Sequence, residues 1–421
     1  MPLSAQAVQS VISILDGVTS GGKTGSPGLV FIAVDKNGKT LVEHASGTRG
    51  INSNQPMDMD TTFWIASCTK TVTAIACMQL VEQGKLSLDD PETVRKYAPE
   101  IGQKKVYADG VTPAEQQRPV TLRMLLSHTA GFAYTFLDPR PTIWGRPVGI
   151  DEFSGDEKEI LDTPLFNQPG TVWQYGTNVD WAGIVLERAT GQKLNDYFQE
   201  HIFKPLGIHN VTMFPTQEMR GNLAYMHQRD PTGVLHERDH LYRRAFNTTS
   251  KEEQQRFLHS GGAGLFAKPK EYISSGPHRP SKQRHMSYQG AKILSADTVN
   301  AMFENQIPEH PNFARNATPP ANPLLANHSK EMYPQEGNPP QGGGLSFFLT
   351  IAPGATGRAA NTAWWAGLAN LFWWVDREKG VAGMIASQVL PFGDPKVVGA
   401  WVAVEKAVYD GLEKDGVRFW N

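Results

Sequence analysis

Ser67-Cys-Thr-Lys70-Thr-Val-Thr-Ala-Ile-Ala-Cys-Met-Gln-Leu-Val81 is a stretch in which a serine and a lysine open a largely apolar run. The pattern predicts a helix, and residues three apart lie on one face of a helix. The Ser67 hydroxyl and the Lys70 amine are therefore expected to be neighbours. This is the arrangement of a serine acyl-enzyme nucleophile, provided that burial lowers the pKa of the lysine enough for it to act as a base.

The sequence around this pair indicates a buried helix. The preceding residues 62–66, Thr-Phe-Trp-Ile-Ala, are mostly apolar, and so are most later positions of the helix before its predicted end at Gly84. A Ser-x-x-Lys spacing also arises by chance at solvated helix starts. Burying a lysine in the first turn of a helix costs free energy, however, and a catalytic role for Lys70 would explain why the residue is there.

The composition is that of a folded protein without a nucleic-acid or membrane partner. The 421 residues are 40% hydrophobic, enough for a sizeable core, and the net charge of −2 comes with no basic stripe. Apolar runs stay short of the roughly 18 residues that span a bilayer, and the start of the chain lacks the pattern of a secretion signal. We therefore expect a cytoplasmic protein.

Neither a cofactor nor a metal is expected. The two cysteines, Cys68 and Cys77, lie about 13 Å apart along one predicted helix, too far for a disulfide. No Cys-x-x-Cys pair occurs in the sequence, and no glycine-rich phosphate loop follows a strand. The Gly-x-Ser-x-Gly turn of α/β-hydrolases is missing from the sequence as well.

Strand signals gather at both ends of the chain. Residues 28–34 and 39–45 flank Asn37-Gly38, the strongest short signal for a β-hairpin. We expect an α+β fold in which one antiparallel sheet is assembled from both chain ends and flanked by helices. Towards the C-terminus the predicted strands are 344–350, 371–376 and 381–386, and the predicted flanking helices are 4–18 and 395–412.

The middle of the chain is predicted to be helical and rich in loops. Residues 306–344 are rich in Pro, Asn and Gly, and so long a loop is typical of a functional lid or a disordered segment. Helix signals lie near 121–126, 178–190, 194–203 and 296–303. We predict one domain over residues 1–421, with sheet-bearing parts at about 1–95 and 344–421 and an inserted helical and loop region at about 96–343.

A second candidate group precedes the predicted helix at 179–188. Tyr175 follows the turn Asn167-Gln-Pro-Gly170 and stands in a loop or at a helix entry, where its phenol can be held against Lys70. An ammonium lowers the pKa of a nearby phenol, which makes Tyr175 a candidate base for Ser67. Taken alone, Tyr175 is better explained as a structural aromatic residue and Asn178 as a helix cap.

A third candidate group, residues 361–370, precedes a predicted strand. A turn of small residues that leads to an edge strand can present a backbone N–H to a developing oxyanion, with the N–H of Ser67 as the second donor. Trp364 and Trp365 would line the pocket with flat apolar surface. The alternative is a tryptophan cluster in the core, which we expect for at least one of the two.

Together these groups resemble the serine β-lactamase and penicillin-binding protein superfamily, and within it the class C-like esterases of family VIII. Ser67-x-x-Lys70, Tyr175 before a Trp-Ala-Gly helix, and Trp365-x-Gly367 follow the order found in that family. The segment 175–183 is most similar to fungal members, which include statin-type acyltransferases and statin-ester hydrolases. Further landmarks of the family are matched by residues 121–131, 205–208 and 260–265.

The resemblance implies a β-lactamase/transpeptidase-like fold, a small-molecule ester as substrate, and a role for each matching residue. Ser67 is expected to be the nucleophile, and Lys70 and Tyr175 are expected to handle protons. The backbone N–H groups of Ser67 and Leu368 are expected to form the oxyanion hole. The residues expected to contact substrate are Tyr134, Trp365 and Gly367.

Departures from the family pattern bear on the substrate. Class C β-lactamases have Tyr-x-Asn where this chain has Thr177, with the nearest Asn one residue later. They have Lys-Thr-Gly where this chain has Trp365-Ala-Gly, so a cation that attracts the β-lactam carboxylate is replaced by an aromatic ring. This favours a serine esterase for an apolar or polyketide-type acyl group.

Three alternatives to ester hydrolysis stay open at this point. An acyltransferase would share every catalytic residue and differ only in the acceptor that reaches the acyl-enzyme. A β-lactamase or D-Ala peptidase is disfavoured by the missing lysine. A binding or sensor protein with an idle pocket is disfavoured by the intact set of Ser67, Lys70 and Tyr175.

Overall fold

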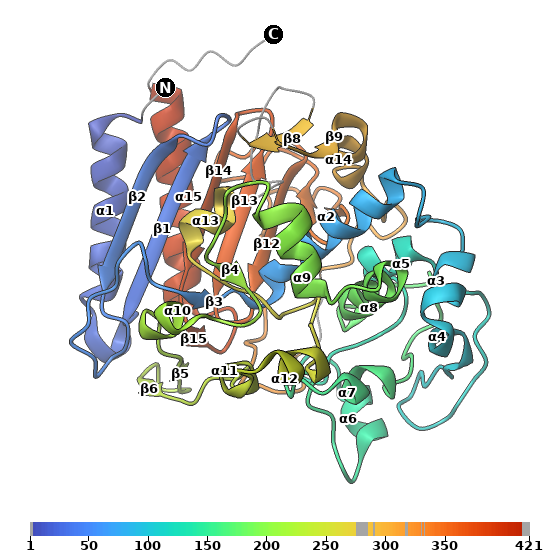
Figure 1. Cartoon of the computed structure of the whole chain (residues 1–421). Helices are drawn as coiled ribbons and strands as arrows, with labels where there is room; N and C mark the ends of the chain where they lie inside the picture. Colours follow the sequence, from blue (N-terminus) through green and yellow to red (C-terminus); the bar gives the residue numbers. More distant parts are fainter. Residues whose placement is uncertain are drawn as a thin grey trace.

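An antiparallel sheet of seven strands forms the centre of the molecule (Figure 1). The computed structural model describes residues 3–274, 285–288, 291–315, 319–329, 331 and 333–414. The strands of the sheet are β1 (Gly28–Asp35), β2 (Thr40–Gly47), β10 (Gly342–Gly343), β11 (Phe348–Thr350), β12 (Thr362–Gly367), β13 (Leu371–Asp376) and β14 (Val381–Ala386). They lie in the order β10-β11-β12-β13-β14-β1-β2. Because β1 pairs with β14, the two ends of the chain share one sheet.

The hairpin between β1 and β2 turns where the sequence predicts it. Gly38 adopts a positive φ of 77°, which a glycine reaches without steric cost. The Asp35 carboxylate accepts the backbone N–H groups of Asn37 (2.8 Å) and Lys39 (2.9 Å), and the register shifts between Ala33 and Val34. The turn is thus held by an aspartate and accommodated by a β-bulge.

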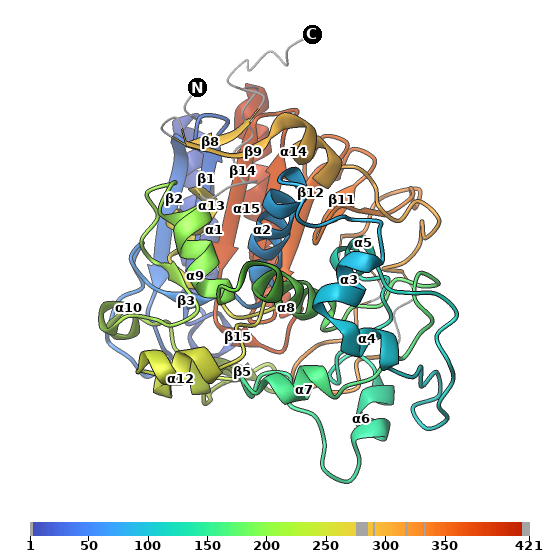
Figure 2. The same ribbon diagram turned by 45° about the vertical axis from the view of Figure 1, so that its right-hand side comes forward.

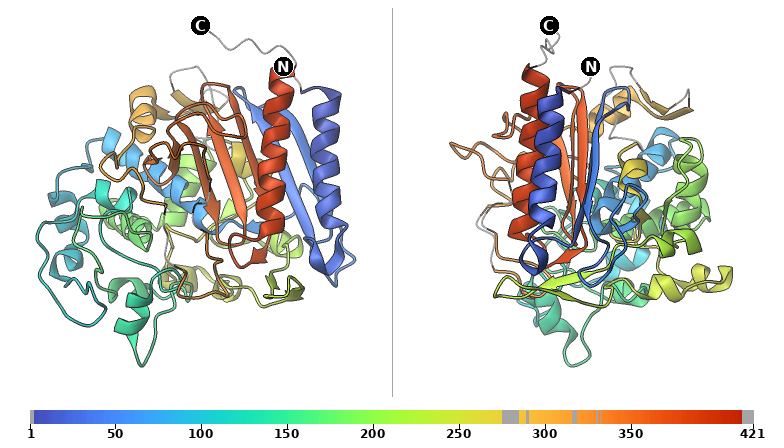
Figure 3. Two further views of the ribbon diagram at one scale, coloured as in Figure 1. Left: turned by 180° about the vertical axis from the view of Figure 1, so that it is seen from behind. Right: turned by 90° about the vertical axis from the view of Figure 1, so that its left-hand side faces the viewer.

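Two long helices from opposite ends of the chain cover one face of the sheet. They are α1 (Ala5–Thr19) and α15 (Pro395–Lys414), and they pack side by side on that face (Figure 3). The Ser4 hydroxyl caps α1 by accepting the N–H of Ala7 at 3.2 Å. Val11 and Trp401 are fully buried on the inner sides of these helices.

The middle of the chain covers the opposite face (Figure 2). Here β3 (Phe63–Trp64) leads through a 3-10 turn, η2 (Ala66–Cys68), into α2 (Thr69–Glu82), which packs against α8 (Asn178–Thr190). All residues of α2 from Thr69 to Leu80 are buried. Since helices cover both faces of the sheet, its central strands are apolar at consecutive positions instead of alternating.

Short elements complete the middle region. None of the helices in the described residues is long and apolar enough to cross a membrane. The helices are η1 (Gly22–Thr24), α3 (Glu92–Tyr97), α4 (Pro99–Gln103), α5 (Leu122–Leu126), α6 (Pro139–Gly145), α7 (Glu157–Leu161), α9 (Leu194–Phe198), the π-helical η3 (Gln199–Phe203), α10 (Gln217–Gly221), α11 (Arg244–Asn247), α12 (Lys251–Arg256), α13 (Pro269–Ser274) and α14 (Ala296–Met302). The strands form three small sheets, β3-β7-β4, β15-β5-β6 and β8-β9, with β4 (Val211–Thr212), β5 (His227–Arg229), β6 (Leu235–Glu237), β7 (Phe266–Ala267), β8 (His285–Tyr288), β9 (Ala291–Ser295) and β15 (Val389–Leu390).

The predicted α+β class, with one antiparallel sheet built from both chain ends, is confirmed. The hairpin, β13, β14 and the helices α1, α5, α8, α14 and α15 lie where they are predicted, within a few residues. The single helix predicted at 194–203 instead divides into α9 and the π-helical η3.

Residues 361–370 differ from the prediction. They are not a turn before an edge strand, because Thr362–Gly367 form β12, which lies inside the sheet between β11 and β13. The turn follows the strand at 368–370. Small and aromatic residues on a strand that is covered on both faces give no alternating pattern, which explains why the strand is not evident from the sequence.

The strand predicted at 344–350 is interrupted. Ser346 has a positive φ of 70°, and its backbone N–H (2.8 Å) and hydroxyl (3.2 Å) both donate to the carbonyl of Leu126 at the end of α5. Only β11 remains of this strand. In residues 306–341 the described part contains no helix or strand, and 316–318, 330 and 332 lie outside the described residues. A lid role for 306–344 stays a prediction.

Candidate functional site

Ser67 lies in the turn η2 between β3 and α2. The preceding residue, Ala66, has a positive φ of 44°, which is costly for a residue with a Cβ. Backbone hydrogen bonds hold the turn, from the N–H of Ile65 to the carbonyl of Leu265 (3.0 Å) and from the N–H of Cys68 to the carbonyl of Ile65 (3.0 Å). The surrounding structure therefore maintains a strained conformation directly before Ser67.

Lys70 is fully buried one turn further along, with its amine beside Ser67. Nζ lies 3.1 Å from Ser67 Oγ, and it donates to the Tyr134 hydroxyl (3.2 Å) and to the Gly262 carbonyl (2.9 Å). Burial lowers the pKa of Lys70 to about 7, against the opposing effect of the Asp180 charge. A large share of Lys70 is therefore free amine at neutral pH, with its lone pair available to Ser67.

Tyr175 lies in the loop before α8, and its hydroxyl donates to Ser67 Oγ at 2.6 Å. The Lys70 Nζ lies over the face of the Tyr175 ring, 4.7 Å from its centre. Burial raises the pKa of Tyr175 above its usual value. The predicted lowering of this pKa is therefore wrong, because the amine faces the ring and burial disfavours the phenolate. The structure presents a neutral phenol to Ser67.

Tyr134 brings a second hydroxyl to the same amine. It accepts from Lys70 at 3.2 Å, and its ring meets that of Tyr175 edge-on with centroids 5.1 Å apart. A backbone hydrogen bond from the N–H of Tyr134 to the carbonyl of Tyr175 (3.3 Å) joins the two loops. Burial raises the pKa of Tyr134 well above its usual value, so Tyr134 is also a neutral phenol.

Aromatic rings surround the phenol of Tyr175. Trp365 on β12 meets the Tyr175 ring edge-on at 5.4 Å, and Trp173 stacks on it at 6.1 Å. The ring of His128 packs against the rings of Tyr175 and Trp365, with centroids 4.9 Å and 6.0 Å apart. The ring of Phe348 packs on that of Trp365, with centroids 4.4 Å apart. These rings form an apolar wall around the phenol beside Ser67, and contact of Trp365 with substrate stays a prediction.

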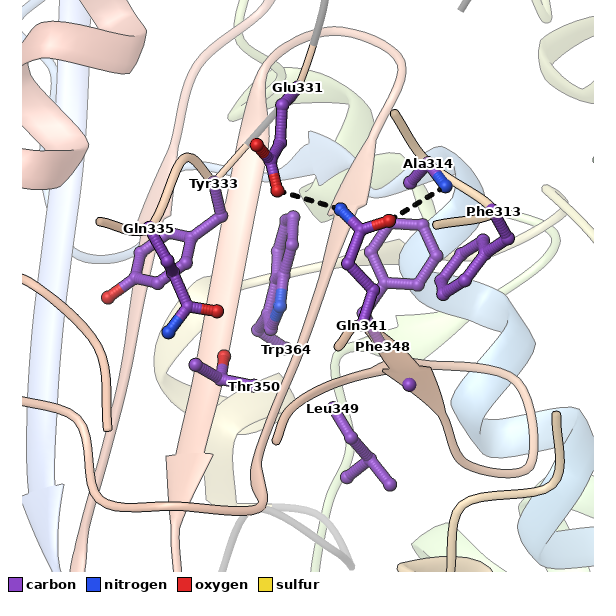
Figure 4. A pocket seen from close by; sticks show the side chains of 11 residues that line it. Phe313, Ala314, Glu331, Tyr333, Gln335, Gln341, Phe348, Leu349, Thr350 and Trp364 are labelled. Carbon is purple, nitrogen blue, oxygen red and sulfur yellow. Dashed lines mark hydrogen bonds between the residues drawn. The ribbon is translucent and has the colours of Figure 1, made fainter. Parts of the chain in front are cut away.

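The two neighbouring tryptophans do not share this site. Trp364 points to the other face of β12, where it packs on Trp401 (5.6 Å) and Tyr333 (5.8 Å). There it lines a separate small pocket at the edge of the sheet, together with side chains that include Phe348 and Gln341 (Figure 4). Of the predicted pair, only Trp365 faces the rings around Ser67, since successive side chains on a strand alternate.

The end of β12 closely approaches the Ser67 turn. A Cβ at Gly367 would lie 2.6 Å from the carbonyl oxygen of Ile65, so this contact requires glycine. Leu368 follows directly. The turn is anchored by the fully buried Asn370, whose amide donates to the carbonyls of Val389 (2.8 Å) and Pro391 (2.9 Å). The backbone around Leu368 is therefore held against the turn that carries Ser67.

Cys68 follows the nucleophile but is fully buried, and burial raises the pKa of its thiol. It is therefore a neutral side chain, which agrees with its predicted role as a small apolar residue. Among the residues that the structure describes, no cluster of His, Cys, Asp or Glu could hold a metal ion.

Sequence reasoning missed two residues that contact this set and one that is buried behind it. Gly262, which belongs to the landmark at 260–265, supplies the carbonyl that Lys70 contacts. His128, which belongs to the landmark at 121–131, packs against Tyr175. Asp180 is buried in the first turn of α8. Burying a carboxylate in an apolar helix costs free energy, as burying Lys70 does. The argument that singles out Lys70 could therefore have singled out Asp180 as well.

Comparison with known proteins gives the family of the chain. A family model described as Beta-lactamase matches residues 15–407. The chain belongs to the beta-lactamase family. Within this family, a lovastatin esterase of Penicillium rubens is 32% identical over 388 residues, which cover 86% of this chain and 89% of the relative. A monacolin J acid methylbutanoyltransferase of Aspergillus terreus is 30% identical and covers 91% of both chains.

The fold comparison points to the same branch of the beta-lactamase family. A mutant of simvastatin synthase from Aspergillus terreus superposes with a TM-score of 0.79 at 27% identity, covering 97% of this chain and 96% of that one. The predicted β-lactamase-like fold is thus confirmed. The relatives are named as an esterase and as acyl-transferring enzymes. The comparisons therefore support an ester hydrolase or acyltransferase for this beta-lactamase family member.

Proposed function

We propose that the chain is a serine esterase that forms an acyl-enzyme on Ser67. The observation that carries this proposal is the environment of the Ser67 hydroxyl, which lies 3.1 Å from a buried amine and 2.6 Å from a neutral phenol. A nucleophile with a base on one side and an acid on the other is what acyl transfer from an ester requires.

In the first step, the Ser67 proton passes to the amine of Lys70 as Oγ attacks the ester carbonyl. The carbonyl oxygen becomes an oxyanion, which the backbone N–H groups of Ser67 and Leu368 stabilise. The approach of Gly367 to the Ile65 carbonyl supports this placement. Tyr175 then gives its phenol proton to the leaving alcohol. Because the amine lies over the ring of Tyr175, the Lys70 ammonium returns a proton to the phenolate oxygen through a water molecule once the alcohol has left.

In the second step, an acceptor takes the acyl group from Ser67. The Lys70 amine removes a proton from water and the hydroxide attacks the acyl-enzyme. The Lys70 ammonium then returns this proton to Ser67 Oγ as the carboxylic acid leaves. If an alcohol replaces water, the product is a new ester. Both outcomes use the same residues, and acyl transfer is the second candidate because a relative that matches 91% of this chain is named a methylbutanoyltransferase.

The apolar wall supports a substrate with an apolar acyl or alcohol group. Trp365 and Phe348 lie 4.4 Å apart, and Trp173 extends the same surface along Tyr175. Flat apolar rings match a short branched acyl chain or a polycyclic alcohol of the polyketide type. β-Lactam and D-Ala peptide substrates are less favoured, since Trp365 takes the place of a cation for their carboxylate. We expect no turnover of a chromogenic cephalosporin.

A partition experiment tests this function. The enzyme is given p-nitrophenyl esters of graded acyl length, with and without a bulky alcohol acceptor, and free acid and new ester are both quantified. We expect free acid as the main product, and none of either product from Ser67→Ala. New ester in excess of acid would establish the acyltransferase instead. Retention of most activity by Ser67→Ala would reject the proposal.

A further inference from the structure

A buried carboxylate stands behind the base without touching it directly. Asp180 in the first turn of α8 is 3% exposed. Its Oδ1 accepts the hydroxyl of Ser260 at 2.5 Å and the backbone N–H of Gly262 at 3.0 Å. The Ser260 hydroxyl also accepts the N–H of Ala263 at 2.9 Å. Asp180 therefore fixes the turn formed by residues 260–263.

A single residue of this turn connects Asp180 with Lys70. The N–H of Gly262 donates to Asp180, and its carbonyl accepts from Lys70 Nζ at 2.9 Å. A Cβ at Gly262 would lie 2.4 Å from Asp180 Oδ2, so only glycine allows the carboxylate to approach this closely. The peptide groups of the turn thus transmit the position of Asp180 to the amine beside Ser67.

The charge of Asp180 matters most when Lys70 holds the proton of Ser67. A buried ammonium is costly unless an anion offsets it, and interactions between buried charges are only weakly screened. Burial raises the pKa of Asp180, whereas the Lys70 charge and the hydrogen bonds from Ser260 (2.5 Å) and Gly262 (3.0 Å) favour its ionised form, most of all when Lys70 is protonated. A negative Asp180 therefore stabilises the ammonium that forms during the reaction.

The other titratable groups around Lys70 do not supply this charge. Burial raises the pKa values of the thiol of Cys68 and the phenols of Tyr134 and Tyr175, and lowers that of the imidazole of His128 well below its usual range, so these four stay neutral. Glu152 binds the N–H and hydroxyl of Thr135, and burial raises its pKa to about 7. Glu152 is therefore the group whose titration must be separated from that of Lys70.

We infer that Asp180 is a positioning residue: it holds Gly262, whose carbonyl accepts a hydrogen bond from Lys70, and it stabilises the protonated amine. Asp180 thereby sets the pH at which Lys70 becomes a free base. This inference rests on the proposed acyl-enzyme function. Asp180 has no contact with the reacting atoms, and it acts on them only through Lys70 and the turn 260–263.

The test is the pH dependence of kcat/KM for a p-nitrophenyl ester, followed at the isosbestic wavelength of the product. Asp180→Asn keeps an oxygen that can accept from Ser260 and Gly262 but removes the charge. The Lys70 amine then loses its proton more readily, so the acid limb of the profile moves to lower pH by about one unit or more. We also expect kcat to fall by at least tenfold, because the ammonium is no longer offset.

Two control variants separate this effect from general damage to the turn. Ser260→Ala keeps the charge but removes two hydrogen bonds of the turn, so it should lower kcat without displacing the acid limb. Glu152→Gln should likewise leave the limb in place. If Asp180→Asn does not fold, as judged by thermal unfolding, Gly262→Ala replaces it, since the added Cβ displaces the carboxylate and should move the limb in the same direction.

An acid limb that stays in place in Asp180→Asn or in the replacement variant would overturn the inference, as would an equal displacement in Ser260→Ala. Movement of the limb in Glu152→Gln alone would assign the titration to Glu152. These results are distinct from failure of the proposed function, which would appear as full activity of Ser67→Ala.

Discussion

At the scale of single residues, burial is what makes Lys70 a candidate base, because it lowers the pKa of the amine to about 7. The Lys70 amine donates to two acceptors, the Tyr134 hydroxyl and the Gly262 carbonyl. The remaining side of the amine faces Ser67 Oγ. The sequence predicts the adjacency of Ser67, Lys70 and Tyr175. It does not predict how the Lys70 amine meets Tyr175, because contact with a ring face or with a phenol oxygen depends on the loop that carries Tyr175.

The rate should follow the ionisation of Lys70. Because its pKa is lowered to about 7, kcat/KM is expected to rise about tenfold per pH unit below that value and to level off above it. A pH profile of ester hydrolysis checks this. Lys70→Arg, which keeps the charge but provides no base near neutral pH, should lose nearly all activity. A flat profile between pH 5 and 8 would contradict the role of Lys70.

The two tyrosines form a matched pair for mutation. Tyr175→Phe removes the hydroxyl that donates to Ser67 at 2.6 Å and should lower kcat by about 10² to 10⁴-fold. Tyr134→Phe removes a partner of Lys70 and leaves Ser67 untouched, so we expect a loss at least about tenfold smaller. Steady-state kinetics with one ester compares them. Equal losses would show that Tyr175 has no special role as the proton donor.

At the scale of elements, the strand β12 and the turn after it determine the position of the Leu368 N–H, the proposed second oxyanion donor. The sequence locates the motif Trp365-x-Gly367 but not its secondary structure. A strand covered by helices on both faces lacks alternation, and the turn depends on Asn370, whose four partners come from residues 389–394. Such long-range contacts leave no local pattern in the sequence.

Replacing Asn370 should destabilise the protein. Asn370→Ala leaves four backbone groups without their buried partner, and we expect a loss of about 2 to 4 kcal/mol in the free energy of unfolding. Asn361→Ala is the control, since Asn361 also has a positive φ but is exposed; its cost should be under about 1 kcal/mol. Urea unfolding of both variants provides the comparison, and similar losses would refute the anchoring role of Asn370.

At the scale of the whole molecule, the chain ends are joined by β1 and β14 and by the helices α1 and α15. The hairpin signal at Asn37-Gly38 and the helices predicted at 4–18 and 395–412 allow this part to be predicted from the sequence. The helical middle is harder to predict, because short elements such as α3, α5 and α9 are fixed by packing against α8. The family match over residues 15–407 supports the proposal that residues 1–421 form one domain.

One domain with a shared sheet should unfold as a unit. Because β1 pairs with β14, unfolding of one chain end removes the hydrogen-bonding partner of the other, so neither end is expected to stay folded alone. Scanning calorimetry is expected to give a single transition whose calorimetric and van't Hoff enthalpies agree. Two separate transitions would indicate that the middle region is an independent domain.

The proposed mechanism requires an acyl-enzyme on Ser67. Intact-protein mass spectrometry detects this intermediate directly. The protein is mixed briefly with a p-nitrophenyl ester, quenched in acid and weighed, and the modified peptide is then sequenced. We predict a mass increase of one acyl group on the wild-type chain, located at Ser67 and missing from Ser67→Ala. An adduct of equal yield on Ser67→Ala, or turnover by the wild type through an adduct at another residue, would contradict the account.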